Sequence, residues 1–366
     1  MLRAGIVGLP NVGKTTFFNA VTAQSSALIS NYPFSSSKAN VGVVAVPDER
    51  LAPLAKLVKT SVLVPASVEF VDIAGLVRGS SKGEGLGNQF LHNIRETDTM
   101  VQVVRCFEDD AVVHVDGSID PRRDMETIQI ELALADLATV ERRRERVQKA
   151  AKGGEKTARA ELEVLDKLQP ALEEFRPAQS VSLDPEELAI ARNYFLLTMK
   201  PTIYAANVSE TTLAAPHESA HVRAVQEAAA SEGSECVIIC ARLEADLVEL
   251  SVEEQREYLE SLDITSSGAD KLIKSAYRVL GLMSFLTAGE KEARAWTIRQ
   301  GSRAQDAAGA IHSDIARGFI RAEIVGYDDL IRAGSYAAAR EQGLLRLEGK
   351  DYIMQEGDIV NFRFNV

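Results

Sequence analysis

The sequence predicts an α/β protein: a doubly wound, mainly parallel sheet that is interrupted by a helical insertion and followed by a small α+β domain. Two observations support this prediction. Short runs rich in Val and Ile alternate with helical patterns, as expected of a parallel sheet covered by helices on both faces. The alternation stops once for a purely helical stretch and changes character from about Leu282 onward.

Six apolar runs of four to six residues are the expected strands. Their length and their content of β-branched residues suit strands that are buried on both faces. They are Ala4–Val7, Val41–Val46, Val68–Val71, Met100–Val104, Thr202–Ala206 and Cys236–Cys240. With the helices between them, they assign residues 1–125 and 200–281 to one sheet domain.

The helical insertion is expected over residues 126–199. Apolar residues recur there at spacings of three and four on both sides of Lys152-Gly153-Gly154, which predicts a coiled-coil hairpin that turns at the glycines. A further helix is expected to begin at Pro185, with Asp184 as its N-cap.

The last segment, residues 282–366, is expected to form the α+β domain from short strands and one helix. Phe319–Val325 predicts one strand, and the segment from Tyr352 to Phe362 predicts two strands joined at a turn that contains Gly357.

The composition is that of an ordinary globular protein. Hydrophobic residues make up 46% of the 366 residues and charged residues 26%, which excludes a disordered or fibrous chain. A chain of this size buries a large core without disulfides. The formal net charge of −12 argues against indiscriminate binding to polyanions, although it allows a local basic patch.

The three cysteines, Cys106, Cys236 and Cys240, lack the spacing of zinc ligands. We expect reduced thiols, no disulfides and a reducing compartment. No run approaches the ~18 apolar residues of a membrane span, and the amino terminus does not resemble a signal peptide. We therefore expect a soluble, cytoplasmic protein with no membrane partner.

The segment Gly8-Leu9-Pro10-Asn11-Val12-Gly13-Lys14-Thr15 predicts a phosphate-binding loop. It follows a buried strand and precedes a helical pattern, which is the context such a loop requires. The glycines allow backbone N–H groups to turn toward phosphates at a helix N-terminus. Lys14 is expected to reach the β- and γ-phosphates, and the Thr15 hydroxyl to bind Mg²⁺.

Two further segments are expected to complete a nucleoside triphosphate site. Asp72-Ile73-Ala74-Gly75 ends the third strand, where Asp72 is placed to hold Mg²⁺ and the Gly75 N–H to contact the γ-phosphate. The polar loop Asn31–Asn40 is expected to be a switch loop in which Ser35, Ser36 or Ser37 offers a hydroxyl to Mg²⁺. Gly75 is followed by Leu76, which cannot hydrogen-bond a water molecule, and by the glycine-rich run Gly79–Gly87.

The expected base site departs from a guanine reader. Guanine sites usually read Asn-Lys-x-Asp after a strand, whereas this chain has Asn207-Val208-Ser209-Glu210. The Lys is absent and Glu210 is one methylene longer than Asp, so the paired acceptor for guanine is displaced. Cys240-Ala241-Arg242-Leu243-Glu244 resembles the loop that closes over the base.

These motifs, together with Asn88-Gln89-Phe90-Leu91 after the glycine-rich run, resemble the YchF (Obg-like ATPase) family over essentially the whole chain. The resemblance implies an OBG-type G domain of the TRAFAC class of P-loop NTPases, a coiled-coil insertion and a C-terminal TGS domain of β-grasp type. It also implies ATP hydrolysis, often with GTP as a second substrate, and association with ribosomes and their RNA. The ribosomal partner is left open between the large subunit, the small subunit and the 70S particle.

Residue by residue, the resemblance implies that Val208 contacts adenine through its backbone and that Thr15 and Ser36 supply the Mg²⁺ hydroxyls. His114 becomes the candidate catalytic group beside Lys14, and Asn11 makes K⁺ a possible cofactor. The implied phosphate and base contacts are Asn11, Val12, Gly13, Lys14, Thr15, Thr16, Gly75, Asn207, Val208, Glu210 and Ala241. The switch loop reads Ser36-Ser37-Lys38 where the family usually has Thr-Ile-Asp/Glu.

Three other functions compete with an ATP-hydrolysing translation switch. They are a GTP-specific translation GTPase, a nucleotide-sensing module whose hydrolysis is incidental and, least favoured, a metabolic P-loop kinase. A basic run at the hairpin turn favours a macromolecular partner, because residues 141–159 carry eight Lys and Arg but three Glu.

Overall fold

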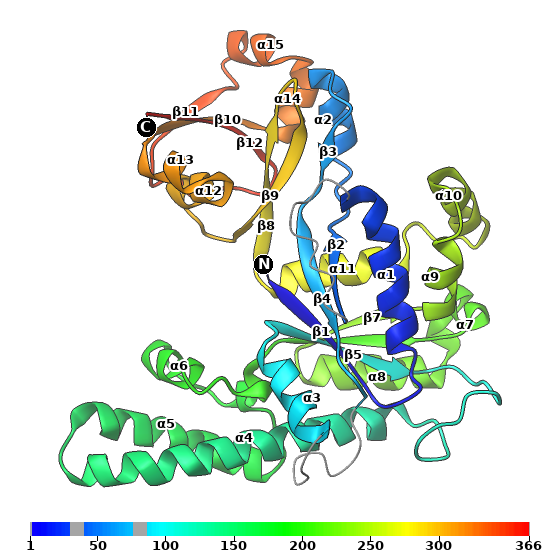
Figure 1. Cartoon of the computed structure of the whole chain (residues 1–366), viewed down its shortest axis with the longest axis vertical. Helices are drawn as coiled ribbons and strands as arrows, with labels where there is room; N and C mark the ends of the chain where they lie inside the picture. The colour runs from blue at the N-terminus through cyan, green and yellow to red at the C-terminus, as the bar shows by residue number, and fades with distance from the viewer. Residues whose placement is uncertain (1, 30–39, 76–85, 366) are drawn as a thin grey trace.

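The computed structural model describes residues 2–29, 40–75 and 86–365 (Figure 1). The expected Mg²⁺ ligand Ser36 lies outside the described residues, as do Leu76 and most of the glycine-rich run. The chain forms two sheets, with a long helical hairpin projecting from the first (Figure 1). Among the described residues, no helix is both long and apolar enough to cross a membrane.

The first sheet has the strand order β2-β4-β1-β5-β6-β7. All its neighbouring strands are parallel except β2 and β4, which are antiparallel. The strands are β1 (Arg3–Val7), β2 (Val41–Ala45), β4 (Ser67–Asp72), β5 (Thr99–Arg105), β6 (Thr202–Asn207) and β7 (Glu235–Ile239). All six expected strands are confirmed, each within one residue at either end.

Helices cover both faces of this sheet, so the doubly wound architecture is confirmed (Figure 1). Residues of β5 are buried along its whole length, as expected of a central strand between two layers. The helices that belong to this part of the chain are α1 (Lys14–Ile29), α3 (Leu86–Arg95), α7 (Glu210–Ala214), α8 (Ala220–Ser231), α9 (Ala241–Leu247), α10 (Val252–Ser261) and α11 (Gly268–Val279), with a 3-10 turn η3 (Pro216–Glu218).

The insertion is an antiparallel pair of helices, α4 (Pro121–Lys152) and α5 (Lys156–Glu173), which we call the arm. The pair has its own apolar core, in which Val140, Leu165 and Leu168 are completely buried. The predicted turn at Gly153-Gly154 is confirmed. Helix α6 (Pro185–Arg192) begins as predicted, with Asp184 in a capping box.

The arm is fastened to the sheet domain at Asp136. This buried carboxylate accepts hydrogen bonds from the backbone N–H of Leu197 and of Thr198, both at 2.8 Å. Both donors lie in the 3-10 turn η2 (Leu197–Met199), which leads into β6, and a similar turn, η1 (Ala178–Ser180), precedes α6. Burial raises the pKa of Asp136 to about 6. This contact fixes the middle of α4, and the turns before it pack on β5 and α8.

The second sheet has the order β11-β10-β12-β8-β9-β3. Its strands are β3 (Leu63–Val64), β8 (Leu282–Ala288), β9 (Ala293–Arg299), β10 (Phe319–Gly326), β11 (Arg346–Glu348) and β12 (Asp358–Phe364). The edge strand β3 comes from the amino-terminal part of the chain and pairs with β9, and helix α2 (Leu51–Val58) before it packs on the same sheet. The sequence pattern did not reveal that β3 and α2 belong with the second sheet.

Two expectations for the last segment are wrong. The described part of residues 282–366 contains four helices rather than one: α12 (Ala304–Ile311), α13 (Ser313–Arg317), α14 (Tyr327–Ala333) and α15 (Tyr336–Glu341). The terminal hairpin does not form either, because β10 and β8 occupy both edges of β12. Ile353 instead makes an isolated bridge with Arg303.

Candidate functional site

The phosphate loop connects β1 to α1 at the carboxyl edge of the first sheet. Gly8, Asn11 and Gly13 have positive φ angles of 156°, 61° and 95°, so the chain turns tightly before the first helical turn. The Lys14 side chain is folded into this loop and its Nζ donates to the Leu9 carbonyl at 2.7 Å. Burial lowers the pKa of Lys14 to about 8, although the charge of Asp72 opposes the shift.

Thr15 and Asp72 meet beside the loop. The Thr15 hydroxyl donates to Asp72 Oδ2 at 2.9 Å, and Oδ1 of the same carboxylate is buried without a hydrogen-bond partner. A hydroxyl beside an unsatisfied carboxylate oxygen is the kind of hard oxygen pair that Mg²⁺ prefers. The residues present therefore fit a magnesium ion.

Gly75 lies directly against the phosphate loop. A Cβ at this position would stand 3.1 Å from Lys14 Nζ and 3.2 Å from the Pro10 nitrogen. A side chain here would need these neighbours to shift by a few tenths of an ångström, and the close approach brings the end of the Asp72 segment next to the lysine that the sequence assigned to the phosphates.

Asn207 joins three segments of the site. Its Nδ2 donates to the Val12 carbonyl at 2.8 Å, and its Oδ1 accepts from the Ala241 N–H at 2.9 Å. The side chain is buried, so it ties the phosphate loop to the start of α9. A Cβ on Gly13 would stand 2.4 Å from Asn207 Nδ2, a distance that no side chain tolerates.

A cavity of about 630 Å³ opens beside these residues and is the candidate base pocket. Val208 and Glu210 line it as expected, but the Val208 N–H donates to the Ile239 carbonyl at 2.9 Å and is thus used within the fold. The described lining is Asn11, Gly13, Thr16, Phe107, Glu108, Asp109, Val112, Asn207, Val208, Ser209, Glu210, Thr211, Cys240, Ala241 and Arg242.

Sequence reasoning missed Phe107, which lines the same pocket. Arg105, buried at the end of β5, fixes it: Nε donates to the Phe107 carbonyl at 3.1 Å, and the guanidinium carbon lies 4.6 Å from the ring centroid. The available signal was its position, since an aromatic residue two places after a central strand lies at the same sheet edge as the phosphate loop.

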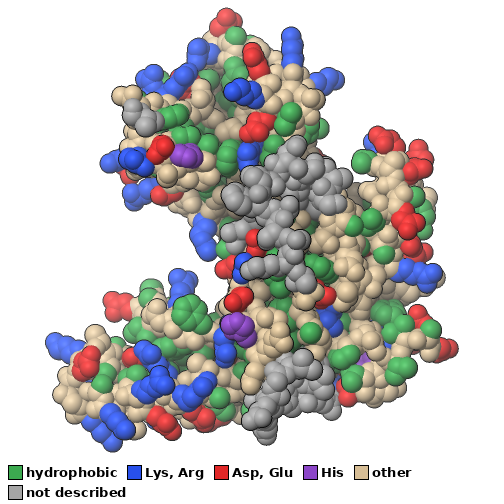
Figure 2. Space-filling model, viewed as in Figure 1, with side chains coloured by type: hydrophobic (Ala, Val, Ile, Leu, Met, Phe, Trp, Pro, Cys, Tyr) green, Lys and Arg blue, Asp and Glu red, His purple; other side chains and the backbone are tan. Residues whose placement is uncertain are grey.

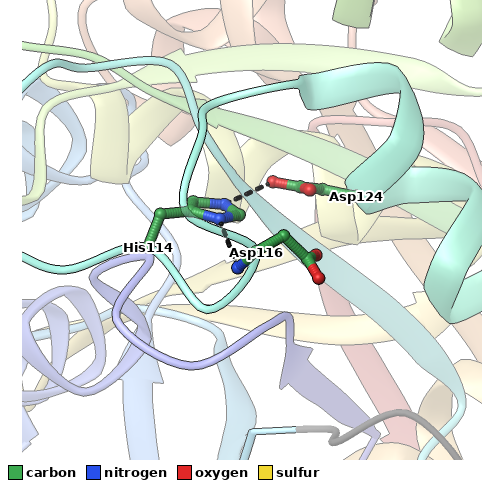
Figure 3. A group of neighbouring side chains, drawn as sticks. All are labelled: His114, Asp116 and Asp124. Atoms are coloured by element: carbon green, nitrogen blue, oxygen red, sulfur yellow. Dashed lines mark hydrogen bonds and ion pairs between the residues drawn. The ribbon is translucent and has the colours of Figure 1, made fainter.

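His114 lies in the loop that follows β5 and points into the protein (Figure 3). Its Nε2 is 2.8 Å from Asp124 Oδ2, and the Asp116 N–H donates to Nδ1 at 3.1 Å. Because Nδ1 accepts a hydrogen bond, Nε2 carries the ring proton and donates a hydrogen bond to Asp124 Oδ2. The loop touches the phosphate loop through Asn11, whose Nδ2 donates to the Val113 carbonyl at 3.1 Å.

The group His114, Asp116 and Asp124 offers three ligand atoms within 4.8 Å of one another. Arg123 already supplies the positive charge, with Nη2 3.0 Å from Asp124 Oδ1 and Nε 3.7 Å from Asp116 Oδ2. A metal ion would have to displace this guanidinium, so the group is an ion-pair cluster rather than a metal centre.

The structure thus brings most of the expected residues to one edge of the sheet. Asp72 and Gly75 lie beside Lys14 and Thr15 at the end of the phosphate loop. Asn207 bonds the loop to the start of α9. His114 is not among the described residues that line the pocket, and Asp124 and Asp116 engage both of its ring nitrogens, so its catalytic role stays a prediction.

A glycine-containing loop leads from β1 of a doubly wound sheet into its first helix, and Lys14, Thr15 and Asp72 lie together at the end of this loop. This arrangement defines a P-loop nucleotide-binding protein. Two family models agree. The model described as a 50S ribosome-binding GTPase matches residues 3–135. The model YchF-GTPase_C, described as a protein of unknown function (DUF933), matches residues 282–365.

Full-length relatives narrow this class. The chain is 52% identical over 365 residues to the ribosome-binding ATPase YchF of Bacillus subtilis (strain 168), with both chains covered completely. It is 50% identical over 364 residues to the protein of that name from Escherichia coli O157:H7, covering 100% of this chain and 99% of the relative.

A solved structure agrees along the whole chain. The YchF GTPase of Schizosaccharomyces pombe is 36% identical and superimposes with a TM-score of 0.89, covering 99% of this chain and 97% of that one. The chain belongs to the YchF family, and the resemblance drawn from its motifs is confirmed.

Proposed function

We propose that this protein is a P-loop ATPase that hydrolyses ATP to ADP and phosphate, uses GTP more weakly, and acts as a nucleotide-dependent switch on the ribosome in the cytoplasm. The observation that carries the proposal is the coupling of the phosphate loop, through Asn207, to a base pocket without the Lys and Asp of a guanine reader. Relatives named ribosome-binding ATPases support both the nucleotide and the partner.

Mg²⁺ is the proposed cofactor. Thr15, Ser36 and Asp72 are the residues proposed to hold it, directly or through water, and the ion would neutralise charge on the β- and γ-phosphates. Lys14 would move from the Leu9 carbonyl to the phosphates, where a charged partner replaces a neutral one. Asn11 is the residue through which K⁺ would assist.

ATP is expected to bind more tightly than GTP. The pocket offers Val208 and Glu210 where a guanine reader needs Lys and Asp, and the loss of a bidentate purine contact costs ~1–3 kcal/mol by analogy with base readout. Changing Val208→Lys and Glu210→Asp together should move the preference toward GTP. Titration calorimetry with both nucleotides measures the two affinities.

The matched control is Glu218→Asp, which makes the same shortening at an exposed position in the 3-10 turn η3, outside the pocket lining. It should leave both affinities unchanged. GTP binding at least tenfold tighter than ATP in the unmodified protein, about 1.4 kcal/mol, would contradict the proposal.

The arm is the proposed contact to ribosomal RNA, since Lys and Arg side chains gather over it (Figure 2). These side chains are not all equally available to bind RNA. Arg143 is 2.5 Å from Glu161, and Arg144 is 2.7 Å from Asp166, so both are held against α5. Arg146, Lys149 and Lys152 are exposed on the last turns of α4, at spacings of three residues.

Changing Arg146, Lys149 and Lys152 to Gln is expected to weaken co-sedimentation with ribosomes and to flatten its salt dependence. Contacts to phosphates release counterions, and each lost contact removes ~0.7–0.9 units from the log–log slope. The control is Arg143→Gln with Arg144→Gln, which removes charges already paired within the arm. Equal loss from both variants, or no loss from either, would assign the contact elsewhere, most directly to the second sheet's domain.

The experiment that tests the whole proposal is ATP turnover with and without 70S ribosomes and their separate subunits, in potassium and in sodium. A switch is stimulated by its partner. Turnover that no ribosomal particle changes would favour the alternative, a nucleotide-sensing module whose hydrolysis is incidental, and the sodium arm would show whether K⁺ assists.

A further inference from the structure

The loop that carries His114 has an inverted pattern of burial. The imidazole is buried with 7% of its surface exposed, whereas the flanking Val113 and Val115 are 74% and 50% exposed. Two apolar side chains in water around a buried polar ring run against the hydrophobic effect, so local polar contacts must hold this arrangement.

Those contacts come from the first turn of α4. Asp124 Oδ2 accepts a hydrogen bond from His114 Nε2 at 2.8 Å. Arg123 donates to the Ser118 carbonyl at 2.6 Å and to the Ser118 hydroxyl at 3.0 Å. Arg123 also binds Asp124 Oδ1, which orients the carboxylate toward the ring. The side chains of Asp124 and His114 are both almost completely buried. The loop is thus held at His114 and at Ser118 by two adjacent residues of one helix.

The same helix forms the arm. Helix α4 has 32 residues and is anchored at Asp136. At 1.5 Å per residue, Asp124 lies about 18 Å to one side of this anchor and Lys152 about 24 Å to the other. The turns of α4 before Asp136 pack on β5 and α8, so one unbroken helix joins the His114 contacts to the exposed end of the arm. A displacement of this helix by about 1 Å is enough to break a hydrogen bond.

We infer that Asp124 is a positioning residue that holds His114 buried against α4, and that α4 connects this restraint to a partner at the arm's end, whose binding releases His114. The inference rests on the proposed function and on the predicted role of His114 in hydrolysis. It adds the residue that restrains His114 and the element that transmits partner binding. Such coupling requires two arrangements of the loop, and the structure shows the one in which Asp124 holds His114.

The first test is Asp124→Asn, which keeps the shape of the side chain but removes its charge and places an amide donor against either Arg123 or the His114 Nε2–H. Weakening the restraint raises the fraction of molecules with His114 released, so ribosome-free kcat should rise about tenfold with KM for ATP unchanged. Asp124→Glu, which restores the charge, should return kcat toward the unmodified value. Asp110→Asn, an exposed acid in the same loop, is the control and should change nothing.

Stimulation of ATP turnover by ribosomes tests the role of α4. Because Asp124→Asn releases His114 in advance, ribosomes should stimulate it several-fold less than the unmodified protein while co-sedimenting equally well. A fall in kcat for Asp124→Asn would overturn the inference, since Asp124 would then assist His114 rather than restrain it. Undiminished ribosome stimulation would overturn it as well.

The variant His114→Ala distinguishes a failure of this inference from a failure of the predicted role of His114. If His114→Ala alone leaves turnover unchanged, the proposed role of His114 fails. If His114→Ala lowers turnover and Asp124→Asn has no effect on kcat, the role of His114 stands and the inference fails. When both hold, the double variant should turn over as slowly as His114→Ala alone.

Should Asp124→Asn fold poorly, the imidazole itself reports the restraint. Nitrogen-15 NMR of the histidine side chains, with His114 assigned by its loss in His114→Ala, should show the Nε2–H form in the ribosome-free protein. An averaged mixture of tautomers there would contradict the restraint.

Discussion

Replacing Gly13 with alanine is expected to reduce ATP affinity tenfold or more. The new Cβ would stand 2.4 Å from Asn207 Nδ2, and Gly13 has a φ of 95°, which side chains rarely adopt. Asn207 must move, and it then loses its bonds to the Val12 carbonyl and the Ala241 N–H. Two broken buried hydrogen bonds and a strained residue cost about 2–5 kcal/mol, spread between stability and the shape of the phosphate loop. Titration calorimetry measures the affinity, and thermal unfolding measures the stability.

Gly154→Ala is the matched control. Gly154 has a φ of 90°, but nothing lies within 4 Å of its would-be Cβ, so the substitution imposes the same backbone strain without a collision. It should leave ATP binding intact. The double variant Gly13→Ala with Asn207→Ala removes the collision partner and should lose less than the sum of the two single changes. Additive losses would show that Asn207 does not mediate the effect.

The six strands of the first sheet were predictable because their signal is local. A strand buried on both faces is a short apolar run, and runs such as Met100–Val104 stand out against polar neighbours. The phosphate loop was predictable for the same reason, since its glycines, lysine and threonine are contiguous. The arm was predictable because its apolar spacing repeats on both sides of one glycine pair.

The terminal domain was less predictable because its helices are short and rich in alanine. Helix α12 packs Ala304, Ala307 and Ala308 against the second sheet, where small side chains allow close approach. Alanine gives a weak apolar signal, so the helical period is hard to see. Strand β3 was hidden for another reason: its partner β9 lies more than 200 residues away, and pairing over such a distance leaves no local pattern.

In the site, contacts between distant segments were the unpredictable part. The motif places Asn207 near the base, but it does not reveal that both ends of this side chain are used to brace the phosphate loop. The resemblance singles out His114, but it does not reveal that Asp124 and Asp116 engage both ring nitrogens. These arrangements depend on where α4 and α9 begin relative to the sheet, which tertiary packing decides.

Removing the imidazole of His114 is expected to lower kcat for ATP about 10²–10³-fold while leaving ATP affinity nearly unchanged. Leu76 cannot orient a water molecule, and one well-placed group that stabilises developing charge contributes a factor of this size. An effect on kcat and kcat/KM alike identifies an interaction made in the transition state. Single-turnover hydrolysis and calorimetry measure the two quantities. His92 is an exposed histidine of α3 that lies 3.5 Å from Glu96. The control variant His92→Ala should hydrolyse ATP normally. Normal turnover in His114→Ala would leave the buried ring with a purely structural role, as the partner that satisfies Asp124.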